Sequence, residues 1–590
     1  MRYRIDLGGV AQRQLRLTLE VQTATLELTD GHAEFFVPVW TPGSYLVREY
    51  AQHVSAVSAT GDGGLPLPVT KRAKNRWAVE VGTSESLRVC WSVYAHELTV
   101  RTSYVTDELA FWNGACVALW PVGGQDRPVG VEVLLPGRWE LFAGSLELQR
   151  REASEPGDVK IVRFDCRDLD EFVDTPCLAG PISSWQFDVG GREHRFVPVG
   201  LAGIEPPPSF GGDVQRIVET AAAVFGGDLP FERYTFLALF GVSGRGGLEH
   251  ADSSVLLAPR TTFRPRTAYE DFLALVAHEY LHAWNVKRMR PRALWSIDLE
   301  RENYTGLLWV AEGFTAYYDD LIVRRAGLST PTAYLERLAT HVSAWRANPG
   351  RRAQSLAEAS FDAWMLLYRP GENTRNVTQN YYTNGALAAF VFDAELRRCS
   401  GGARNLDDAL RELWRRSWLA EPSRGFDLDD VIAAIDRAAG TSLEALVRGT
   451  VESAFEPDLE RALGLFGLRL VFADDGPAFV GARFRVGETT IASLEADSPG
   501  WEAGLCPGDE VIAVEGLRVR HDSWQTVWDQ VSRPGQVLCF TIARQGILRE
   551  IGITPTARTE RGTKIVSLVE PSESQLAQRE AWLGSRELRG

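Results

Sequence analysis

The sequence lacks several features that would each point to a particular class of protein. No apolar run approaches the eighteen or so residues that a membrane-spanning helix needs. The seven cysteines are scattered, without a CxxC pair. Residues 1–15 contain arginines but no apolar core and no small-residue cleavage site. We therefore expect no membrane span, no cysteine-ligated metal and no structural disulfide set, and we predict a cytoplasmic location.

A basic surface is missing as well. The chain has 590 residues, a net charge of −15 and a pI of about 5.3. Its longest basic stretch is "VKRMRPR" (286–292). Nucleic-acid binders need a clustered basic face, so nucleic acid is not an expected partner. Lysine occurs five times against fifty-eight arginines, which we attribute to genome composition rather than to function.

The length and the changing pattern along the chain predict several domains. Residues 1–165 are β-rich, because alternation such as that of "QLRLTLEV" (14–21) recurs between turns and suggests a β-sandwich. Residues 166–460 contain a buried strand at 234–242 and then almost continuous helical periodicity. The first of these helices should be capped by Asp213.

The pattern changes again in the last part of the chain. Strand-like segments and one helix, "DSWQTVWDQVSR" (522–533), follow one another between 465 and 556. They predict a small mixed domain. Residues 557–590 are polar and are predicted to form a C-terminal tail.

Two histidines stand four residues apart in "LALVAHEYLHAWNVKRMRP" (273–291). On a helix, His278 and His282 project from one face, and Glu279 stands one position on. Neutral imidazoles suit zinc, and a neighbouring carboxylate can take a proton from water. A helix with incidental histidines is the alternative. The pattern is rare enough in a chain with nine histidines to favour a zinc site.

A third ligand is expected from an acidic residue further along the chain. "LLWVAEGFTAYYDD" (307–320) places Glu312 between apolar residues, where a carboxylate is uncommon unless it is paired or bound to a metal. An acid on the surface of a helix is the alternative. Two histidines and one glutamate would leave zinc an open position for water, which is typical of catalytic sites.

With these motifs in place, the sequence resembles the glycyl aminopeptidase family, zinc metallopeptidases related to aminopeptidase N and thermolysin. The segments that carry the resemblance are "HEYLHAWNVKRMRP", "WVAEGFTAYY", "VPVWTPGSYLVREY" (37–50) and "SPGWEAGLCPGDEVIAVEG" (498–516). It implies a multidomain α+β fold, with a β-rich N-terminal domain, a thermolysin-like, mostly helical catalytic domain and a C-terminal PDZ domain. It also implies one zinc ion and removal of small residues, such as glycine or alanine, from peptides with a free N-terminus.

One more segment gains a role from the resemblance. "GRGGLEHADSS" (244–254) is similar to the glycine-rich segment with which relatives of aminopeptidase N hold a substrate. Glu249 would then hold the α-ammonium group, while Gly246 and Gly247 would let the peptide approach. A flexible surface loop is the alternative, and His250 is given no role.

"NYYTNGALAAF" (380–390) is similar to the segment in which relatives carry a tyrosine that stabilises the oxyanion. That residue would be Tyr382, with Tyr381 as the other possible donor. Thermolysin-like enzymes often have an aspartate four residues after the ligand glutamate, where it supports a histidine. Here the position is Ala316, so the support of the histidines is not identified.

The PDZ-like segment would bind a C-terminal peptide around Val480 and Gly481, in "AFVGA" (478–482). The alternative is a module that packs on the catalytic domain and binds nothing. For the whole chain, a zinc endopeptidase or a non-peptide hydrolase on the same site stays open, as does a PDZ-bearing scaffold with a vestigial site.

Overall fold

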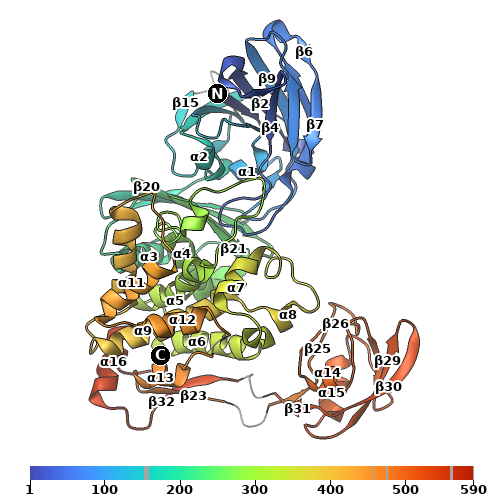
Figure 1. Cartoon of the computed structure of the whole chain (residues 1–590), viewed down its shortest axis with the longest axis vertical. Helices are drawn as coiled ribbons and strands as arrows, with labels where there is room; N and C mark the ends of the chain where they lie inside the picture. Colours follow the sequence, from blue (N-terminus) through green and yellow to red (C-terminus); the bar gives the residue numbers. More distant parts are fainter. Residues whose placement is uncertain (9, 152–158, 455, 473–475, 559–561, 589–590) are drawn as a thin grey trace. The chain divides into compact units, whose positions relative to one another are not determined.

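The computed structural model describes the whole chain except residues 9, 152–158, 455, 473–475, 559–561 and 589–590. The chain divides into two compact units. Unit 1 comprises Met1–Asn303 and Trp414–Gly425, and unit 2 comprises Tyr304–Leu413 and Phe426–Gly590. The elements are labelled in Figure 1. The chain is mixed α and β, with a β-rich N-terminal region and a helical middle region, as the sequence predicted.

The N-terminal region of unit 1 is made of three sheets. In β2, Leu15, Leu17, Leu19 and Val21 are buried and the residues between them are not, so the predicted period of two is confirmed. The largest sheet has the order β15-β16-β13-β1-β2-β9-β5-β6. Its strands are β1 (Arg2–Asp6), β2 (Gln14–Gln22), β5 (Val54–Thr60), β6 (Pro66–Leu67), β9 (Ser86–Tyr94), β13 (Val129–Pro136), β15 (Gln149–Arg151) and β16 (Val159–Cys166).

The two smaller sheets consist of short strands. Two short helices belong to the same region, one between β11 and β12 and the other between β16 and β17. One sheet contains β3 (Leu28–Thr29), β4 (His32–Phe36), β7 (Val69–Ala73), β8 (Arg76–Glu80) and β12 (Trp120–Pro121). The other contains β10 (Ser103–Val105), β11 (Ala110–Trp112), β14 (Glu140–Ala143) and β17 (Cys177–Gly180). The helices are α1 (Gly114–Val117) and α2 (Leu169–Val173).

A mixed five-stranded sheet follows, in the order β18-β19-β20-β22-β21. The predicted strand at 234–242 is its central strand β20, whose interior residues are all buried, as expected of a parallel strand covered on both faces. β19, β20 and β22 are parallel, and β21 pairs antiparallel with β22 at the edge. The bounds are β18 (Trp185–Val189), β19 (Arg192–Val199), β20 (Arg233–Gly241), β21 (Gly246–Glu249) and β22 (Ser253–Pro259).

Two helices of unit 1 pack together beside this sheet, α3 (Phe210–Val224) and α4 (Arg266–Leu281). The predicted cap at Asp213 is wrong, because α3 begins at Phe210 with Ser209 as its N-cap. The buried Asp213 carboxylate instead accepts hydrogen bonds from Ser209 Oγ (2.9 Å) and from the hydroxyl of Tyr269 (2.7 Å). This contact ties α3 to α4, which also packs on β21 and β22.

The first part of unit 2 is helical, as the sequence predicted. It begins with the π-helix η7 (Trp309–Phe314), which runs directly into α5. A β-carbon on Gly313 would lie 2.6 Å from the Cα of Gly385 on α9, so only glycine allows this close crossing of η7 and α9. The helices are α5 (Thr315–Arg325), α6 (Pro331–Arg346), α7 (Leu356–Phe361), α8 (Thr374–Val377), α9 (Tyr381–Cys399), α10 (Leu406–Trp414), α11 (Leu428–Ala439), α12 (Glu444–Val451) and α13 (Leu459–Gly464).

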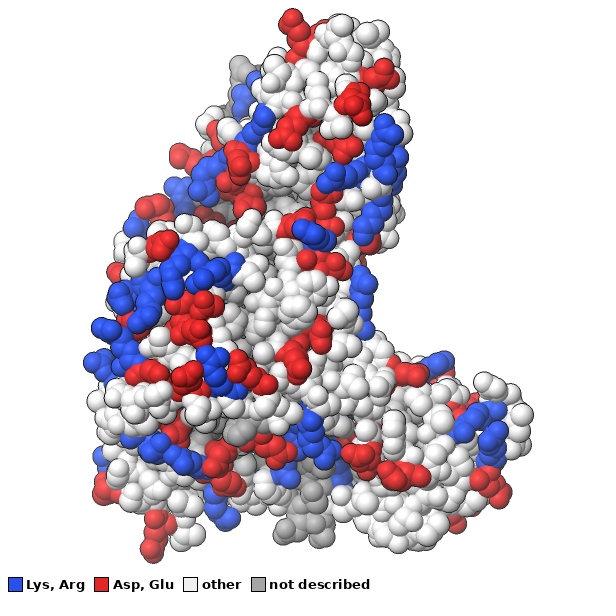
Figure 2. All heavy atoms as spheres, viewed as in Figure 1, with Lys and Arg blue, Asp and Glu red and all other residues white. Residues whose placement is uncertain are grey.

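Charges of both signs lie side by side on the face shown in Figure 2. In the helical region, for example, Asp408 pairs with Arg404 (2.9 Å) and with Arg411 (3.2 Å). Such surface pairs contribute little to stability. Within the described ranges, no helix combines the length and the apolar character that crossing a bilayer requires.

Residues 478–557 form short strands and two short helices around a hydrophobic cluster, and the separate domain at 465–556 stays a prediction. Ile491, Val514, Leu538, Phe540 and Ile542 lie at its centre, and the predicted helix is α15. Its assignment as a PDZ domain stays a prediction. The elements are β24 (Ala478–Phe479), β25 (Ala482–Phe484), β26 (Ile491–Leu494), α14 (Pro499–Glu502), β27 (Glu510–Val514), β28 (Leu517–Arg518), α15 (Trp524–Val531), β29 (Leu538–Arg544), β30 (Ile547–Ile553) and β31 (Thr556–Ala557).

The segment after 557, which the sequence analysis left as a polar tail, contains two further elements. β32 (Lys564–Ser567) pairs with β23 (Leu468–Val471), and α16 (Glu573–Leu583) packs on α5. Trp582 is 1% exposed. Its ring stacks on Phe466 with centroids 4.3 Å apart, and its Nε1 donates to the hydroxyl of Tyr317 at 3.1 Å.

Replacing Trp582 by alanine should therefore destabilise unit 2. Removing a buried tryptophan typically costs about 3–5 kcal/mol, through lost burial and the cavity left behind. We expect a clear fall of the midpoint of thermal unfolding in calorimetry. The matched control is Trp501→Ala, because Trp501 is 45% exposed and its loss should change stability by about 0.5 kcal/mol or less. Equal midpoints for the two variants would contradict the docked C-terminal helix.

Candidate active site

The two histidines of the motif lie together at the end of α4. Their ring centroids are 4.8 Å apart. α4 ends at Leu281, and His282 is its C-cap with helical φ and ψ of −61° and −17°, so both side chains still share one face. Nδ1 of His282 lies 2.6 Å from the carbonyl oxygen of Asn285. Because a carbonyl can only accept, Nδ1 holds the proton and Nε2 is the nitrogen left for a metal. This carbonyl is the support that the sequence did not identify.

Glu279, beside the first histidine, is buried against the edge strand β21. A β-carbon on Gly247 would lie 2.0 Å from Oε1 of Glu279, so glycine is required for the carboxylate to occupy this place. Arg101, from the β-rich region, donates a hydrogen bond to the carbonyl oxygen of Gly247 (3.1 Å). No pattern in the sequence points to Arg101, because it is far away along the chain.

Glu249, the last residue of β21, is 3% exposed. Its Oε1 has no hydrogen-bond partner among the described residues. One ligand atom each from Glu249, Glu279 and His282 lie within 4.8 Å of one another. A buried carboxylate oxygen without a partner is unfavourable. The arrangement therefore suits a cation, either a metal ion or an ammonium group.

A buried ion network holds the end of β21 in place. Oδ1 of Asp174 accepts from Lys287 Nζ (2.7 Å) and lies 3.1 Å from His250 Nδ1, while Oδ2 accepts from the backbone N–H of Ala251 (2.8 Å). Burial alone would raise the pKa of Asp174, but Lys287 and His250 outweigh it and hold the pKa well below its usual range. His250, which had no assigned role, thus helps to fix the strand end that carries Glu249.

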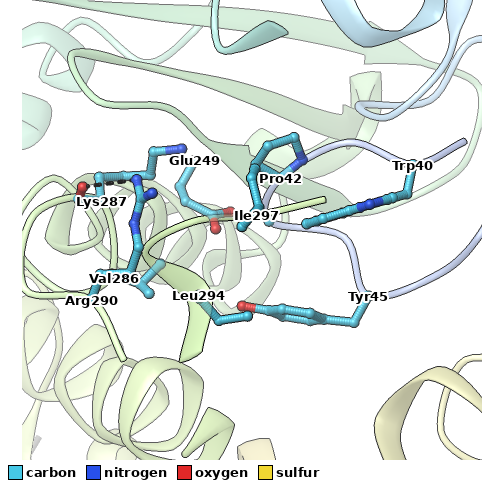
Figure 3. A pocket seen from close by; sticks show the side chains of 10 residues that line it. Trp40, Pro42, Tyr45, Glu249, Val286, Lys287, Arg290, Leu294 and Ile297 are labelled. Atoms are coloured by element: carbon cyan, nitrogen blue, oxygen red, sulfur yellow. Dashed lines mark hydrogen bonds between the residues drawn. The ribbon is translucent and has the colours of Figure 1, made fainter. Parts of the chain in front are cut away.

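A pocket of about 40 Å³ opens beside Glu249, and Figure 3 shows the side chains around it. Its apolar walls come from Trp40, Pro42 and Tyr45 of the β-rich region and from Val286, Leu294 and Ile297 after α4. Lys287 and Arg290 line it as well. The segments 37–50, 244–254 and 273–291, which the sequence singled out, contribute most of these residues. None of them was predicted to line a pocket.

Unit 2 holds the other two predicted residues. Glu312 lies on η7 and is 2% exposed. The hydroxyl of Tyr382, in the first turn of α9, is 2.9 Å from that of Tyr368. Burial raises the pKa of Tyr382 well above its usual value, and the charge of Glu312 adds to this, so the phenol keeps its proton. The hydroxyl of Tyr381 donates to that of Tyr368 at 3.4 Å.

The residues of unit 1 fit a zinc ion. Two imidazoles lie in contact, one of them is oriented by a carbonyl, and carboxylates surround them. Zinc is usually bound by nitrogen and oxygen donors. A histidine ligand usually donates a hydrogen bond from its second ring nitrogen, as His282 does to the carbonyl oxygen of Asn285.

Two models of one peptidase family match the chain. The Peptidase M61 N-terminal domain matches residues 2–181, and the M61 glycyl aminopeptidase model matches residues 271–388. The two ranges together span half of the chain.

Several solved structures are similar to this one. An aminopeptidase N family protein from Idiomarina loihiensis shares 26% sequence identity, with 99% of each chain covered and a TM-score of 0.87. An M1 zinc metallopeptidase from Deinococcus radiodurans, solved as a mutant bound to a Tyr-Ser-Ala substrate, shares 15% identity, with 78% of this chain and 94% of that chain covered and a TM-score of 0.50. At this identity the likeness concerns the fold alone.

A curated relative matches over a short range. "Zinc metalloprotease RasP" from Geobacillus kaustophilus is 31% identical over 96 residues, which is 16% of this chain and 22% of the relative. The match thus spans about a fifth of the relative's length.

The ion network predicts a stability effect at Asp174. Asp174→Asn removes the charge opposite Lys287 and His250, and breaking a buried ion pair typically costs about 3–5 kcal/mol. Because the folded-state pKa lies below that of an unfolded aspartate, the stabilisation is fully present above about pH 4 and is lost as the pH falls through the folded-state value.

Urea unfolding at pH 7 should show this loss for Asp174→Asn and none for Asp107→Asn, a control at an exposed aspartate. If the two variants unfold at the same urea concentration, the network does not stabilise the fold.

Proposed function

We propose that this chain, which belongs to the M61 glycyl aminopeptidase family, is a cytoplasmic zinc metallopeptidase that removes small N-terminal residues, glycine and alanine first, from peptides with a free N-terminus. One observation carries the proposal, the buried Glu249 carboxylate whose Oε1 has no partner among the described residues, beside Glu279 and His282. An exopeptidase has to hold the α-ammonium group, and a charge-assisted hydrogen bond to a buried carboxylate does this.

His278, His282 and Glu312 would hold one zinc ion. Two imidazoles and one carboxylate leave a position open, as in catalytic zinc sites. When bound, zinc polarises a carbonyl oxygen and lowers the pKa of water. The carbonyl of Asn285 orients His282 for this role.

The chain's own residues would do the rest. Glu279 takes a proton from the attacking water and passes it to the leaving amine. Tyr382 keeps its proton and donates a hydrogen bond to the developing oxyanion. Glu249 holds the α-ammonium group next to Glu279, so the first peptide bond is the one presented for cleavage. An endopeptidase substrate would bring no positive charge to Glu249, and a scaffold would not need Glu279.

We also propose that the module at 465–556 is a PDZ domain with a C-terminal peptide as its ligand. The carboxylate would be received around Val480 and Gly481. A β-carbon on Gly481 would lie 2.0 Å from Ser498 Oγ, so the structure leaves no room for a side chain at this position.

Glu279→Gln should keep zinc and lose turnover, because general-base catalysis is typically worth about 10²- to 10⁴-fold. Zinc content by elemental analysis and kcat on an alanyl amide would be measured for Glu279→Gln, Glu312→Ala and the exposed control Glu219→Gln. We expect zinc without activity in the first, loss of zinc in the second and neither change in the third. If Glu279→Gln binds zinc and keeps the kcat of the wild type, Glu279 is not the general base.

The wild type should cut free peptides and leave N-acetylated ones, since acetylation removes the charge that Glu249 binds. Glu249→Gln should lower kcat/KM on free peptides about ten- to a hundred-fold and change little on acetylated ones. Glu232→Gln, at an exposed side chain, is the matched control. Equal cleavage of free and acetylated peptides by the wild type would exclude the aminopeptidase and leave an endopeptidase.

A further inference from the structure

We propose that Tyr368 is a positioning residue for the oxyanion donor: its hydroxyl donates to the hydroxyl of Tyr382, holds it in place and leaves the proton of Tyr382 for the substrate. The inference rests on the proposed function, because it takes Tyr382 to donate a hydrogen bond to the oxyanion. The residues that carry it all belong to unit 2. No pattern in the sequence points to Tyr368.

The backbone of Tyr382 is held at the beginning of α9. Asn380 is the N-cap of this helix, and its side-chain oxygen accepts a hydrogen bond from the backbone N–H of Tyr382 at 2.8 Å. One turn further on, α9 crosses η7, where a β-carbon on Gly385 would lie 3.0 Å from the carbonyl oxygen of Trp309. Because η7 carries Glu312, the backbone of Tyr382 is fixed relative to a proposed zinc ligand.

The hydroxyl of Tyr382 needs a further contact, because it lies at the end of a side chain with two rotatable bonds. Tyr368 supplies this contact, since the two hydroxyl oxygens are 2.9 Å apart. The ring of Tyr382 stacks on that of Tyr381, with centroids 4.8 Å apart and an angle of 25° between the planes. Tyr381 is 0% exposed, so its ring is itself fixed by the core. The ring and the hydroxyl of Tyr382 are thus each held by a different phenol.

The hydrogen bonds among these phenols also have a direction. The hydroxyl of Tyr381 donates to that of Tyr368 at 3.4 Å. A hydroxyl has one proton to donate and two lone pairs that accept, so Tyr368 accepts from Tyr381 and donates to Tyr382. Tyr382 then accepts at its oxygen and does not direct its own proton to Tyr368. Each bond in such a chain polarises the next, which strengthens the donation from Tyr382 to an oxyanion.

Tyr368→Phe tests the proposal, because it removes the hydroxyl and keeps the ring. Loss of one neutral hydrogen bond should lower kcat on an alanyl amide about two- to ten-fold. KM should not change, because the bond contributes only when negative charge develops on the substrate oxygen. The matched control is Tyr318→Phe, which removes another phenol hydroxyl of unit 2, one that donates to Asp407 at 2.7 Å. It should lower the midpoint of thermal unfolding and leave kcat unchanged.

A double variant distinguishes a positioning role from a merely structural one. Tyr382→Phe alone should lower kcat about 10²- to 10³-fold, the usual cost of removing an oxyanion donor. Adding Tyr368→Phe to that variant should not lower kcat further, because the hydroxyl that Tyr368 holds is already gone. If Tyr368→Phe lowers kcat by the same factor with and without the hydroxyl of Tyr382, then Tyr368 does not act through Tyr382 and the proposal is wrong.

The affinity for a phosphinic analogue of the dipeptide Ala-Ala provides a second measurement. The tetrahedral, negatively charged phosphinate resembles the transition state, so the donor should bind it as it binds the oxyanion. In Tyr368→Phe the inhibition constant should rise by the same factor by which kcat falls. An unchanged inhibition constant together with a lowered kcat would contradict the positioning role.

The outcomes separate this inference from the function on which it rests. If Tyr382→Phe keeps the kcat of the wild type, Tyr382 is not the oxyanion donor, and that part of the proposed function is wrong. If Tyr382→Phe loses activity and Tyr368→Phe does not, only the positioning role is wrong. Zinc content and the midpoint of thermal unfolding, measured for each variant, show that the compared proteins are folded and carry the same amount of metal.

Discussion

The carboxylate of Asp174 is the contact on which the arrangement of the candidate site in unit 1 depends. It receives a lysine, a histidine and a backbone amide that come from two segments of the chain. Removing a charge from water costs several kcal/mol per ion. The ion network around Asp174 therefore stabilises the fold only when the carboxylate has all of its partners. Lys287 follows α4, and His250 follows Glu249. Their common partner therefore fixes the Glu249 carboxylate relative to the two histidines.

The site in unit 1 carries more negative than positive charge near the two histidines. Glu249 and Glu279 are both buried, with ligand atoms within 4.8 Å of each other and of His282. Like charges at that separation repel strongly in a low-dielectric environment. Glycine at position 247 and at position 43 lets the two carboxylates approach the backbone, and the repulsion is relieved when cations bind. A metal ion and an ammonium group are two such cations.

The parts of the structure that the sequence predicted are those encoded by short-range patterns. The alternation of β2, the buried strand β20 and the shared face of His278 and His282 all follow from periods of two and 3.6 residues. Asp213 was predicted to be an N-cap because aspartate is common at that position. In the structure it lies inside α3, where its carboxylate accepts a hydrogen bond from Tyr269 on α4. Asp174 and the pocket walls act through partners far away along the chain, and no local pattern marks them. The burial of Trp582 was not predicted, because the residues around it in the sequence are mostly polar.

The bond between Arg101 and the carbonyl oxygen of Gly247 has a consequence for the solubility of unit 1. β21 is an edge strand, and edge strands offer unpaired backbone groups to any other extended chain, which makes them starting points for aggregation. Arg101 occupies one of these acceptors with a charged side chain from the β-rich region. The exposed edge of β21 is thereby partly closed to a second copy of the protein. If the five-stranded sheet were separated from residues 1–181, it would lose this cover and become more prone to self-association.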